Sequence, residues 1–428
     1  MLKITSFNSI AVAVFVLIAT HTEESVAQSH GIPEIPPCNI ELPSTPSSFL
    51  IVDRNYQFPD VQGNSYIKVD HGFPVYWACP GGQFNAPGYN VDGQVANCRG
   101  GGFLNGQFQY ITHKNLTCTL TDPARPALAE IYSNPDIRCE GGSRPVEVGY
   151  NINREFARVL VICYKMYENI PVYAKYTITK WTSLIKNYRS PPSKYFFSGD
   201  LISGDVPRVY TDIESSFEEL GVAQYLNESY FLQKGHLASS DELLYPFQKD
   251  ATYNLANVAP QWNTFDESNW YALEQAVIDL VASGDVGDKA TVLTGTLKVA
   301  TLNNRSGVPV ELYLQNGRFP VPRWFWKIVY LPDLQFGAIF FGYNNIYDKK
   351  IKVDAEFLND ICTVDILETI RSSWSLQLID NSVATNGFVY ACALKTDQIV
   401  DPLIREIVTN TLDEFGTRNV EVFAKRTK

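Results

Sequence analysis

Hydrophobic and polar positions along the chain change their spacing near residue 146. From about residue 31 to residue 145 the apolar stretches are short and are interrupted by Pro and Gly, which is typical of a β-rich module with many turns. Beyond that point, β-branched and aromatic runs at residues 159–164 and 172–178 predict longer strands. We therefore predict a cysteine-rich N-terminal module over residues 28–145 and a larger domain over residues 146–428.

The larger domain combines strands with at least one long helix. Residues 266–282 carry apolar side chains at helical spacing, including Trp270, Leu273 and Val277, and are predicted to be helical. Further strands are predicted at residues 290–295, 324–330 and 336–341, and residues 357–378 are predicted to be partly helical. The pattern predicts a mixed α+β fold with an antiparallel sheet.

The N-terminus has the features of a secretory signal peptide. Lys3 gives a positive start, residues 10–19 are apolar but too short to span a bilayer comfortably, and Ser25 and Ala27 are small residues suited to cleavage. We predict removal of residues 1–27, secretion of the protein and no membrane attachment, since no later apolar stretch is long enough to span a membrane.

Secretion would place the cysteines in an oxidising compartment. An even number of them in an oxidising compartment predicts up to four disulfides, and the lack of any CxxC pair argues against a zinc site built on cysteine. Their connectivity cannot be derived from spacing, although Cys362 with Cys392 is the natural C-terminal pair. Three sequons predict glycosylated surface positions, at Asn115, Asn227 and Asn304.

Charge and length limit the classes of function. The 428-residue chain is long enough for two structural units, and its net charge of −11 argues against a protein that coats nucleic acid with a broadly basic surface. A local cationic groove remains compatible with that total, and Lys180, Arg323 and Lys327 belong to two basic clusters that could line one. For any one of these residues, a solvated surface position is the alternative. The glycines at residues 100–102 lack a following Lys-Ser/Thr, so we predict no nucleotide cofactor.

The candidate chemistry centres on His236, the only histidine beyond residue 113. Lys234 precedes it by two positions, and the stretch 254–274 is rich in amides and carboxylates at the start of the predicted helix. A neutral imidazole can take a proton from water, oxygen ligands can hold a divalent ion, and an ammonium can offset charge on a phosphate. These are the parts of metal-assisted phosphodiester hydrolysis, although an isolated histidine after glycine is more often structural.

Several motifs in order resemble the DNA/RNA non-specific endonuclease family. They are KGHLA at residues 234–238, NVAPQ at 257–261, NW with a following Glu at 269–274, VLTG at 292–295, VPRWFWK at 321–327 and GAIFF at 337–341. The resemblance covers roughly residues 146–420 and implies a ββα-metal active site on a mixed sheet, Mg²⁺ as cofactor and DNA or RNA as substrate. The cysteine-rich front resembles the extra N-terminal region of secreted arthropod members found in gut or saliva.

The resemblance also implies roles for single residues. His236 falls on the family's general base, Asn257 on a supporting asparagine that we place beside the metal, and Glu274 on the glutamate that orients metal-bound water. Lys234 stands where the family has arginine, which loses the bidentate grip on phosphate. Asp266 stands where the family has its metal-binding asparagine, with Asn263 and Asn269 as alternatives if the alignment slips.

Three functions therefore compete. The first is an active secreted nuclease, weakened by the changes at Lys234 and Asp266. The second is a protein on the same scaffold that binds nucleic acid with little or no turnover. The third is an unrelated secreted role, structural or glycan-binding, in which His236 is a core residue.

Overall fold

The computed structural model describes residues 35–41, 50–55, 57–62, 66–80, 82–84, 93–105, 110–111, 118–120, 130–152, 154–184, 196–197, 206–348, 378–394 and 401–414. The stretch Pro36–Lys428 forms one compact unit. The predicted signal peptide, the sequon at Asn115, the cysteine Cys362 and nearly all of the predicted helix at residues 357–378 lie outside the described residues.

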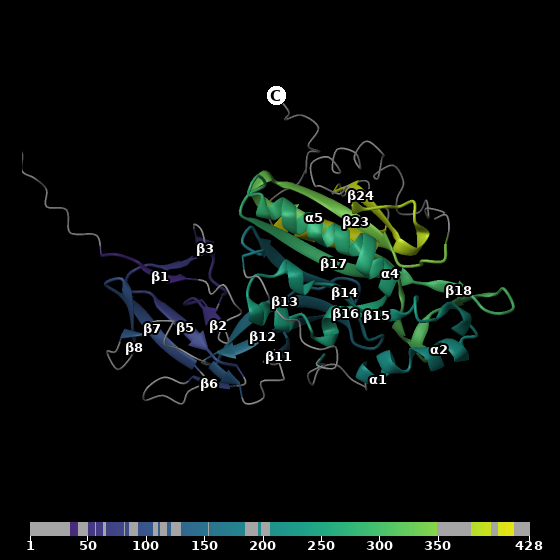
Figure 1. Ribbon diagram of the computed structural model, residues 1–428, viewed down its shortest axis with the longest axis horizontal. Coiled ribbons are helices and arrows are strands. Elements are labelled where there is room, and N and C mark those ends of the chain that lie inside the picture. The colour runs from purple at the N-terminus through teal and green to yellow at the C-terminus, as the bar shows by residue number, and fades with distance from the viewer. Residues whose placement is uncertain are drawn as a thin grey trace, which may run out of the picture. The chain divides into compact units, whose positions relative to one another are not determined.

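An eight-stranded sheet dominates the structure (Figure 1). Every neighbouring pair in it is antiparallel. In spatial order the strands are β11 (Glu130–Ser133), β12 (Arg144–Ile152), β13 (Glu155–Lys165), β14 (Ile170–Thr179), β17 (Lys289–Val299), β22 (Pro322–Leu331), β23 (Phe336–Tyr343) and β24 (Phe388–Ala393). The predicted strands at residues 159–164, 172–178, 290–295, 324–330 and 336–341 all fall within this sheet.

Both faces of the central strands are covered. All eight residues of β23 are buried, and β22 is buried at every position except Arg323. Burial on both sides explains why these strands are near-continuous apolar runs in the sequence rather than alternating ones. The aromatic run Trp324–Trp326 is therefore part of the core, with each of its three side chains no more than 1% exposed.

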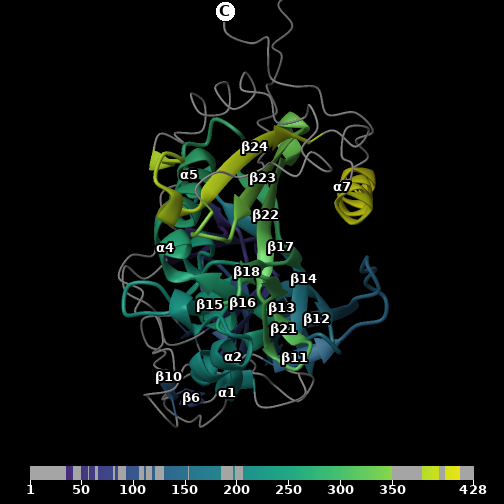
Figure 2. The same cartoon turned by 90° about the vertical axis from the view of Figure 1, so that its right-hand side faces the viewer.

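Helix α5 (Tyr271–Ala282) and helix α7 (Pro402–Glu414) lie on opposite sides of the sheet, as Figure 2 shows. Strand β14 links to both, because successive side chains of a strand point to opposite faces. On one face Lys175 forms an ion pair with Glu414 of α7. On the other face Tyr176 reaches the segment that follows His236, which places the candidate site on the α5 side of the sheet.

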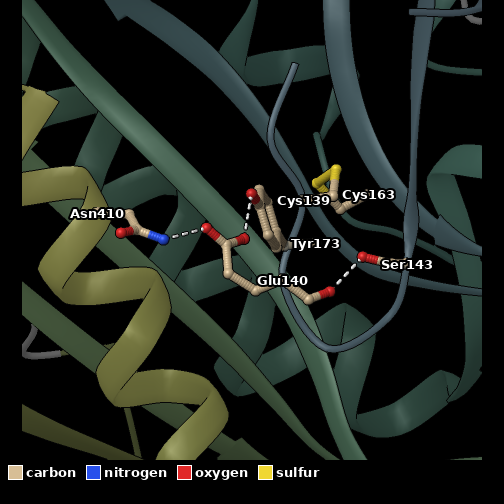
Figure 3. The surroundings of a disulfide bond; sticks show 6 residues. All are labelled: Cys139, Glu140, Ser143, Cys163, Tyr173 and Asn410. Atoms are coloured by element: carbon tan, nitrogen blue, oxygen red, sulfur yellow. Dashed lines mark hydrogen bonds between the residues drawn. A yellow bond between two sulfur atoms is a disulfide. The ribbon is translucent and has the colours of Figure 1, made fainter. Parts of the chain in front are cut away.

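A disulfide between Cys139 and Cys163 fastens the start of this sheet (Figure 3). The neighbouring Glu140 is buried and accepts hydrogen bonds from the Tyr173 hydroxyl, at 2.7 Å, and from the Asn410 amide of α7, at 2.7 Å. The carboxylate therefore joins the disulfide loop, the sheet and the C-terminal helix at one point.

The N-terminal part of the chain is built from short strands around a small core. Its sheets have the strand orders β1-β4-β3, β10-β6 and β2-β5-β7-β8-β9. Disulfides Cys38–Cys98 and Cys79–Cys118 cross this core, as expected for a module of this size and composition. The strands are β1 (Cys38–Glu41), β2 (Leu50–Val52), β3 (Val61–Gln62), β4 (Tyr66–Val69), β5 (Pro74–Ala78), β6 (Gly82–Phe84), β7 (Gly93–Arg99), β8 (Gly102–Asn105), β9 (Tyr110–Ile111) and β10 (Cys118–Leu120).

The remaining elements are short. The helices are α1 (Val206–Thr211), α2 (Ile213–Glu219), α3 (Pro246–Ala251), α4 (Asn263–Phe265), η3 (Ala223–Tyr225), η4 (Ser240–Glu242), η5 (Leu255–Asn257), η6 (Asp266–Trp270), η7 (Pro332–Leu334) and η9 (Ala384–Asn386). The strands are β15 (Leu232–His236), β16 (Val258–Trp262), β18 (Thr301–Asn303), β19 (Pro309–Glu311), β20 (Tyr313–Gln315) and β21 (Arg318–Pro320).

The fold class predicted from the sequence, mixed α+β with an antiparallel sheet, is confirmed. Three disulfides join described cysteines; Cys392 is also disulfide-bonded, and its partner lies outside the described residues. No helix within the described ranges is long and apolar enough to cross a membrane.

Candidate active site

The candidate site is built on a two-stranded ribbon in which β15 pairs with β16. The register sets His236 opposite Val258, Lys234 opposite Pro260 and Gly235 opposite Ala259. A Cβ at Gly235 would lie 1.9 Å from the side-chain oxygen of Gln261, so only glycine fits between Lys234 and His236. The glycine of the Lys-Gly-His sequence is thus required by the packing of the ribbon.

His236 has the surroundings of a neutral base. Its ring packs against Phe196, with centroids 5.3 Å apart, and against Tyr253, at 4.9 Å. Burial, together with the nearby charge of Lys234, lowers the pKa of His236 to about 4. The Nε2 atom is buried and has no hydrogen-bond partner among the described residues. A neutral imidazole with one uncommitted nitrogen is the state that a general base requires.

Lys234 is half-buried and is held by aromatic rings rather than by a carboxylate. Its ammonium lies 5.2 Å from the Phe196 centroid and 5.1 Å from the Tyr210 centroid. Burial lowers the pKa of Lys234. Within the described part of the chain no acidic side chain forms an ion pair with it, so its charge is available to an incoming anion.

Asn257 fixes the backbone directly after His236. The side chain is fully buried; its amide nitrogen donates to the Ala238 carbonyl and to the Thr252 carbonyl, each at 2.9 Å, and its oxygen accepts from the Ala238 N–H at 3.0 Å. These bonds make Asn257 a support for the backbone that follows His236. Its predicted place beside the metal stays a prediction.

Asp266 starts a π-helical segment, η6, inserted between α4 and α5. Segments of this kind are found frequently at functional sites, because they displace the helix face that follows. One carboxylate oxygen accepts from the Gln233 amide at 2.6 Å, and the other has no hydrogen-bond partner among the described residues. Burial raises the pKa of Asp266 to about 7, against the opposing effect of the Gln233 hydrogen bond.

Glu274 lies in the first turn of α5 and is buried. Burial raises the pKa of Glu274 well above its usual range, while the Lys327 ammonium, 3.9 Å from its Oε1, lowers it. Ser239, three residues after His236, hydrogen-bonds to this carboxylate, and Asp266 acts on it electrostatically. The site therefore links the His236 segment to the start of the helix.

The two alternative asparagines, Asn263 and Asn269, form hydrogen bonds that hold neighbouring backbone segments. Asn263 accepts from the Phe231 N–H and donates to the Ser229 carbonyl. Asn269 binds the backbone of Asp380 and the Gly387 carbonyl. Asp266 is consequently the residue at this helix start with an oxygen left for a ligand.

The donor set fits a hard divalent cation held largely by water. Within the described ranges no group of three or more His, Cys, Asp or Glu side chains forms a metal-binding cluster. Mg²⁺ keeps several waters and needs only one or two carboxylates from the protein. The unpartnered oxygen of Asp266 supplies such a ligand, with Glu274 close enough to act on it electrostatically.

Three basic residues are predicted to bind nucleic acid, and for Lys327 the structure contradicts that prediction. It is 0% exposed and its ammonium binds both oxygens of Glu242, so phosphate cannot reach it. Lys180 forms an ion pair with Asp288. Arg323 is half-buried and donates to the Thr301 hydroxyl at 3.3 Å. The structure does not bring Lys180 or Arg323 into contact with His236.

The described sequons form surface turns. Asn227 is exposed and Asn304 is half-buried, and each side chain accepts hydrogen bonds from backbone N–H groups two and three or four residues ahead. Their glycosylation stays a prediction.

The sequence interpretation missed the residues around the catalytic candidates. These are the aromatic pocket of Lys234, the Gln233 partner of Asp266, and the buried group of Tyr176, Ser239 and Glu242. Only one carried a signal: Ser239 and Glu242 have the spacing of a capping box, and both of its hydrogen bonds are present. The others depend on contacts between distant parts of the chain.

Comparison with known proteins decides the family. The model of the DNA/RNA non-specific endonuclease family matches residues 142–397, more than half of the chain. The chain belongs to this family. The match includes every candidate residue discussed above and agrees with the resemblance of the motifs between residues 234 and 341.

Salivary proteins are among the relatives of this chain. A salivary endonuclease of Lutzomyia longipalpis is 26% identical over 52% of this chain and 54% of its own length. Salivary protein Tsal1 of Glossina morsitans morsitans is 25% identical over 65% of this chain and 69% of its own length. The chain thus spans between about half and two thirds of the length of these relatives. A chain of the solved EndoG/EndoGI complex aligns with a TM-score of 0.33 at 18% identity, covering 52% of this chain and 85% of that chain.

Proposed function

We propose that this protein is a secreted, metal-dependent endonuclease that hydrolyses phosphodiester bonds of DNA, RNA or both, with His236 as general base. The observation that carries the proposal is the state of His236. Its pKa of about 4 keeps the imidazole neutral at physiological pH, and its buried Nε2 has no partner among the described residues. Lys234, which no carboxylate of the described residues pairs with, stands two residues away.

Each candidate residue has a separate role in the proposed hydrolysis. His236 Nε2 takes a proton from the attacking water, and the Phe196 and Tyr253 rings hold the imidazole in place. Lys234 places a positive charge where the phosphoryl oxygens gain negative charge. Asp266 would hold Mg²⁺ or another hard divalent ion through an oxygen ligand, and Glu274 would orient a water beside it. When bound, such an ion would polarise the phosphate and stabilise the leaving oxygen.

One observation favours weakened turnover. Asp266 is hydrogen-bonded to Gln233, and its pKa of about 7 means that it is partly protonated near neutral pH. Lys234 also offers phosphate a point charge in place of a planar guanidinium fork. A protein that holds nucleic acid with little cleavage is therefore the second candidate function.

The extracellular location is part of the proposal. Two disulfides cross the N-terminal core and a third fastens the sheet, which fits an oxidising compartment. The names of the two relatives given above both state a salivary origin, which also fits secretion. We propose that residues 1–27 are removed as a signal peptide and that the mature chain, most of which lies in one compact unit, consists of a cysteine-rich module at residues 28–145 and a nuclease domain at residues 146–428.

The first test is a digestion assay with plasmid DNA and double-stranded RNA, run with Mg²⁺ and with EDTA. We expect cleavage that requires the metal, in the purified protein and not in His236→Ala. A mobility-shift gel from the same samples separates the two functions. Strong shifts without cleavage in either protein would favour the holding function, and the absence of both shift and cleavage would contradict the proposal.

A further inference from the structure

Lys327 lies in β22 at the centre of a buried polar group. Its ammonium donates to Glu242 Oε1 at 2.8 Å, to Glu242 Oε2 at 3.0 Å and to the Tyr176 hydroxyl at 2.9 Å. The side chains of Lys327 and Glu242 are each 0% exposed. Desolvating two charges costs free energy that an ion pair does not always recover, and well-packed apolar residues often stabilise a core as well or better. A gain in folding stability is therefore a weak explanation for the presence of this buried ion pair.

The group holds the segment that follows His236 at both ends. Glu242 ends this segment, and its carboxylate also accepts from the Ser239 N–H at 3.3 Å. The Tyr176 hydroxyl bonds to Glu242 and lies 3.4 Å from the Leu237 carbonyl, immediately after His236. Thr294 of β17 completes the set with a 3.0 Å contact to the same hydroxyl.

The same ammonium also faces the helix. Lys327 Nζ lies 3.9 Å from Glu274 Oε1, and Glu274 binds the Ser239 side chain. One buried cation therefore lies between the carboxylate that anchors the His236 segment and the carboxylate at the start of α5. Removing it would leave two buried acidic groups close together with no counter-charge among the described residues that contact them.

We propose that Lys327, Glu242 and Tyr176 form a brace of positioning residues that fixes His236 and Glu274 relative to each other. This inference rests on the proposed nuclease function. The brace acts through the Leu237–Glu242 segment and touches neither substrate nor the reacting atoms. It gives Lys327 a role at the active site other than the contact with nucleic acid that its sequence position suggested.

The test compares Lys327→Met with the double variant Lys327→Met/Glu242→Gln. The single variant leaves Glu242 charged and unpaired, so we expect a lower melting temperature together with lower kcat. The double variant removes both charges and should recover most of the melting temperature. We expect its kcat to stay about 10- to 100-fold below wild type, as for other residues that orient a catalytic group, with KM and nucleic-acid affinity unchanged. Lys289→Met, which removes an exposed ion pair with Asp60, is the control.

A second readout does not depend on turnover. The pKa of His236 can be followed by NMR of ¹³Cε1-labelled histidine, with the signal assigned by its loss in His236→Ala. In wild type we expect a pKa of about 4, and in the double variant a rise toward 6.5 as the ring loses its fixed, buried position.

The outcomes separate the two claims. A wild type that does not cleave, with a His236 pKa that rises in the double variant, would reject the nuclease and keep the brace. A double variant with wild-type kcat and an unchanged His236 pKa would show that the group is only structural. A weaker nucleic-acid affinity in the Lys327 variants would instead mean that Lys327 contacts phosphate, which also overturns the inference.

Discussion

At the scale of single side chains, the site combines a neutral base with a cation that has no acidic partner in the described part of the chain. Both conditions follow from the same aromatic surroundings. Phe196 contacts the His236 ring and also lies beneath the Lys234 ammonium, so it removes water from both groups. The loss of water lowers the pKa of both groups. His236 is then suited to accept a proton, and Lys234 to bind a phosphate.

The depressed pKa of His236 predicts a loss of stability in acid. Above pH 6.5 the imidazole is neutral in both folded and unfolded chains and contributes nothing. As the pH falls from 6.5 to about 4, the unfolded chain takes up the proton and the folded chain does not, so the free energy of unfolding falls by about 3 kcal/mol. Urea unfolding of wild type and His236→Asn across this range measures the difference. Parallel pH curves for the two proteins would contradict the buried, neutral state.

Replacing Lys234 should weaken binding through one phosphate contact. For Lys234→Met we expect weaker nucleic-acid affinity and a salt dependence, log Kd against log salt, shallower by about one. Lys175→Met is the matched control, because it removes the same charge from the opposite face of the sheet, where Lys175 pairs with Glu414. Equal effects of the two substitutions would show that only net charge matters.

The raised pKa of Asp266 predicts that the Mg²⁺ concentration needed for cleavage depends on pH. With a pKa of about 7, the carboxyl group is mostly protonated at pH 6 and mostly ionised at pH 8. We therefore expect the Mg²⁺ concentration for half-maximal cleavage to fall by about an order of magnitude over this range, since only the ionised form is a good ligand. Asp266→Asn should flatten this dependence. An identical profile in both proteins would remove Asp266 from the metal site.

At the scale of elements, the Leu237–Glu242 segment that follows His236 is held in place by buried hydrogen bonds rather than by a long helix or strand. Asn257 alone supplies three of them. We expect Asn257→Ala to lower the free energy of unfolding by about 2–3 kcal/mol because it leaves buried backbone groups without partners. It should also lower kcat. Asn303→Ala, at an exposed position, is the control for urea unfolding, and a similar midpoint in both variants would contradict the role assigned to Asn257.

Most elements of the large sheet could be predicted because their sequence pattern is local. Strand β23 is apolar and aromatic throughout because it is buried on both faces, so an unbroken run of that kind marks it without knowledge of the fold. The π segment at Asp266 could not be predicted in the same way. Its apolar spacing matches that of an ordinary α-helix, and the segment lies where Phe265 and Trp270 pack on the distant Phe325.

At the scale of the whole molecule, the sequence predicted the catalytic candidates better than the buried residues that hold them in position. His236 could be found because the larger domain has no other histidine and because its motif resembles a family. Lys327 could not be placed, because its partner Glu242 is 85 positions away and a strand lysine near an arginine suggests a surface. Its position within an uninterrupted apolar strand was the one warning that it is buried.

The central claim is that this fold cuts nucleic acid by means of His236. The most direct test is cleavage of a fluorescent duplex at saturating Mg²⁺ by wild type and His236→Ala, with the bound fraction measured in the same samples. We predict metal-dependent cleavage by wild type, a loss of at least about a thousandfold in the variant and equal binding by both. Equal cleavage rates in the two proteins, or none in either despite full binding, would contradict the account.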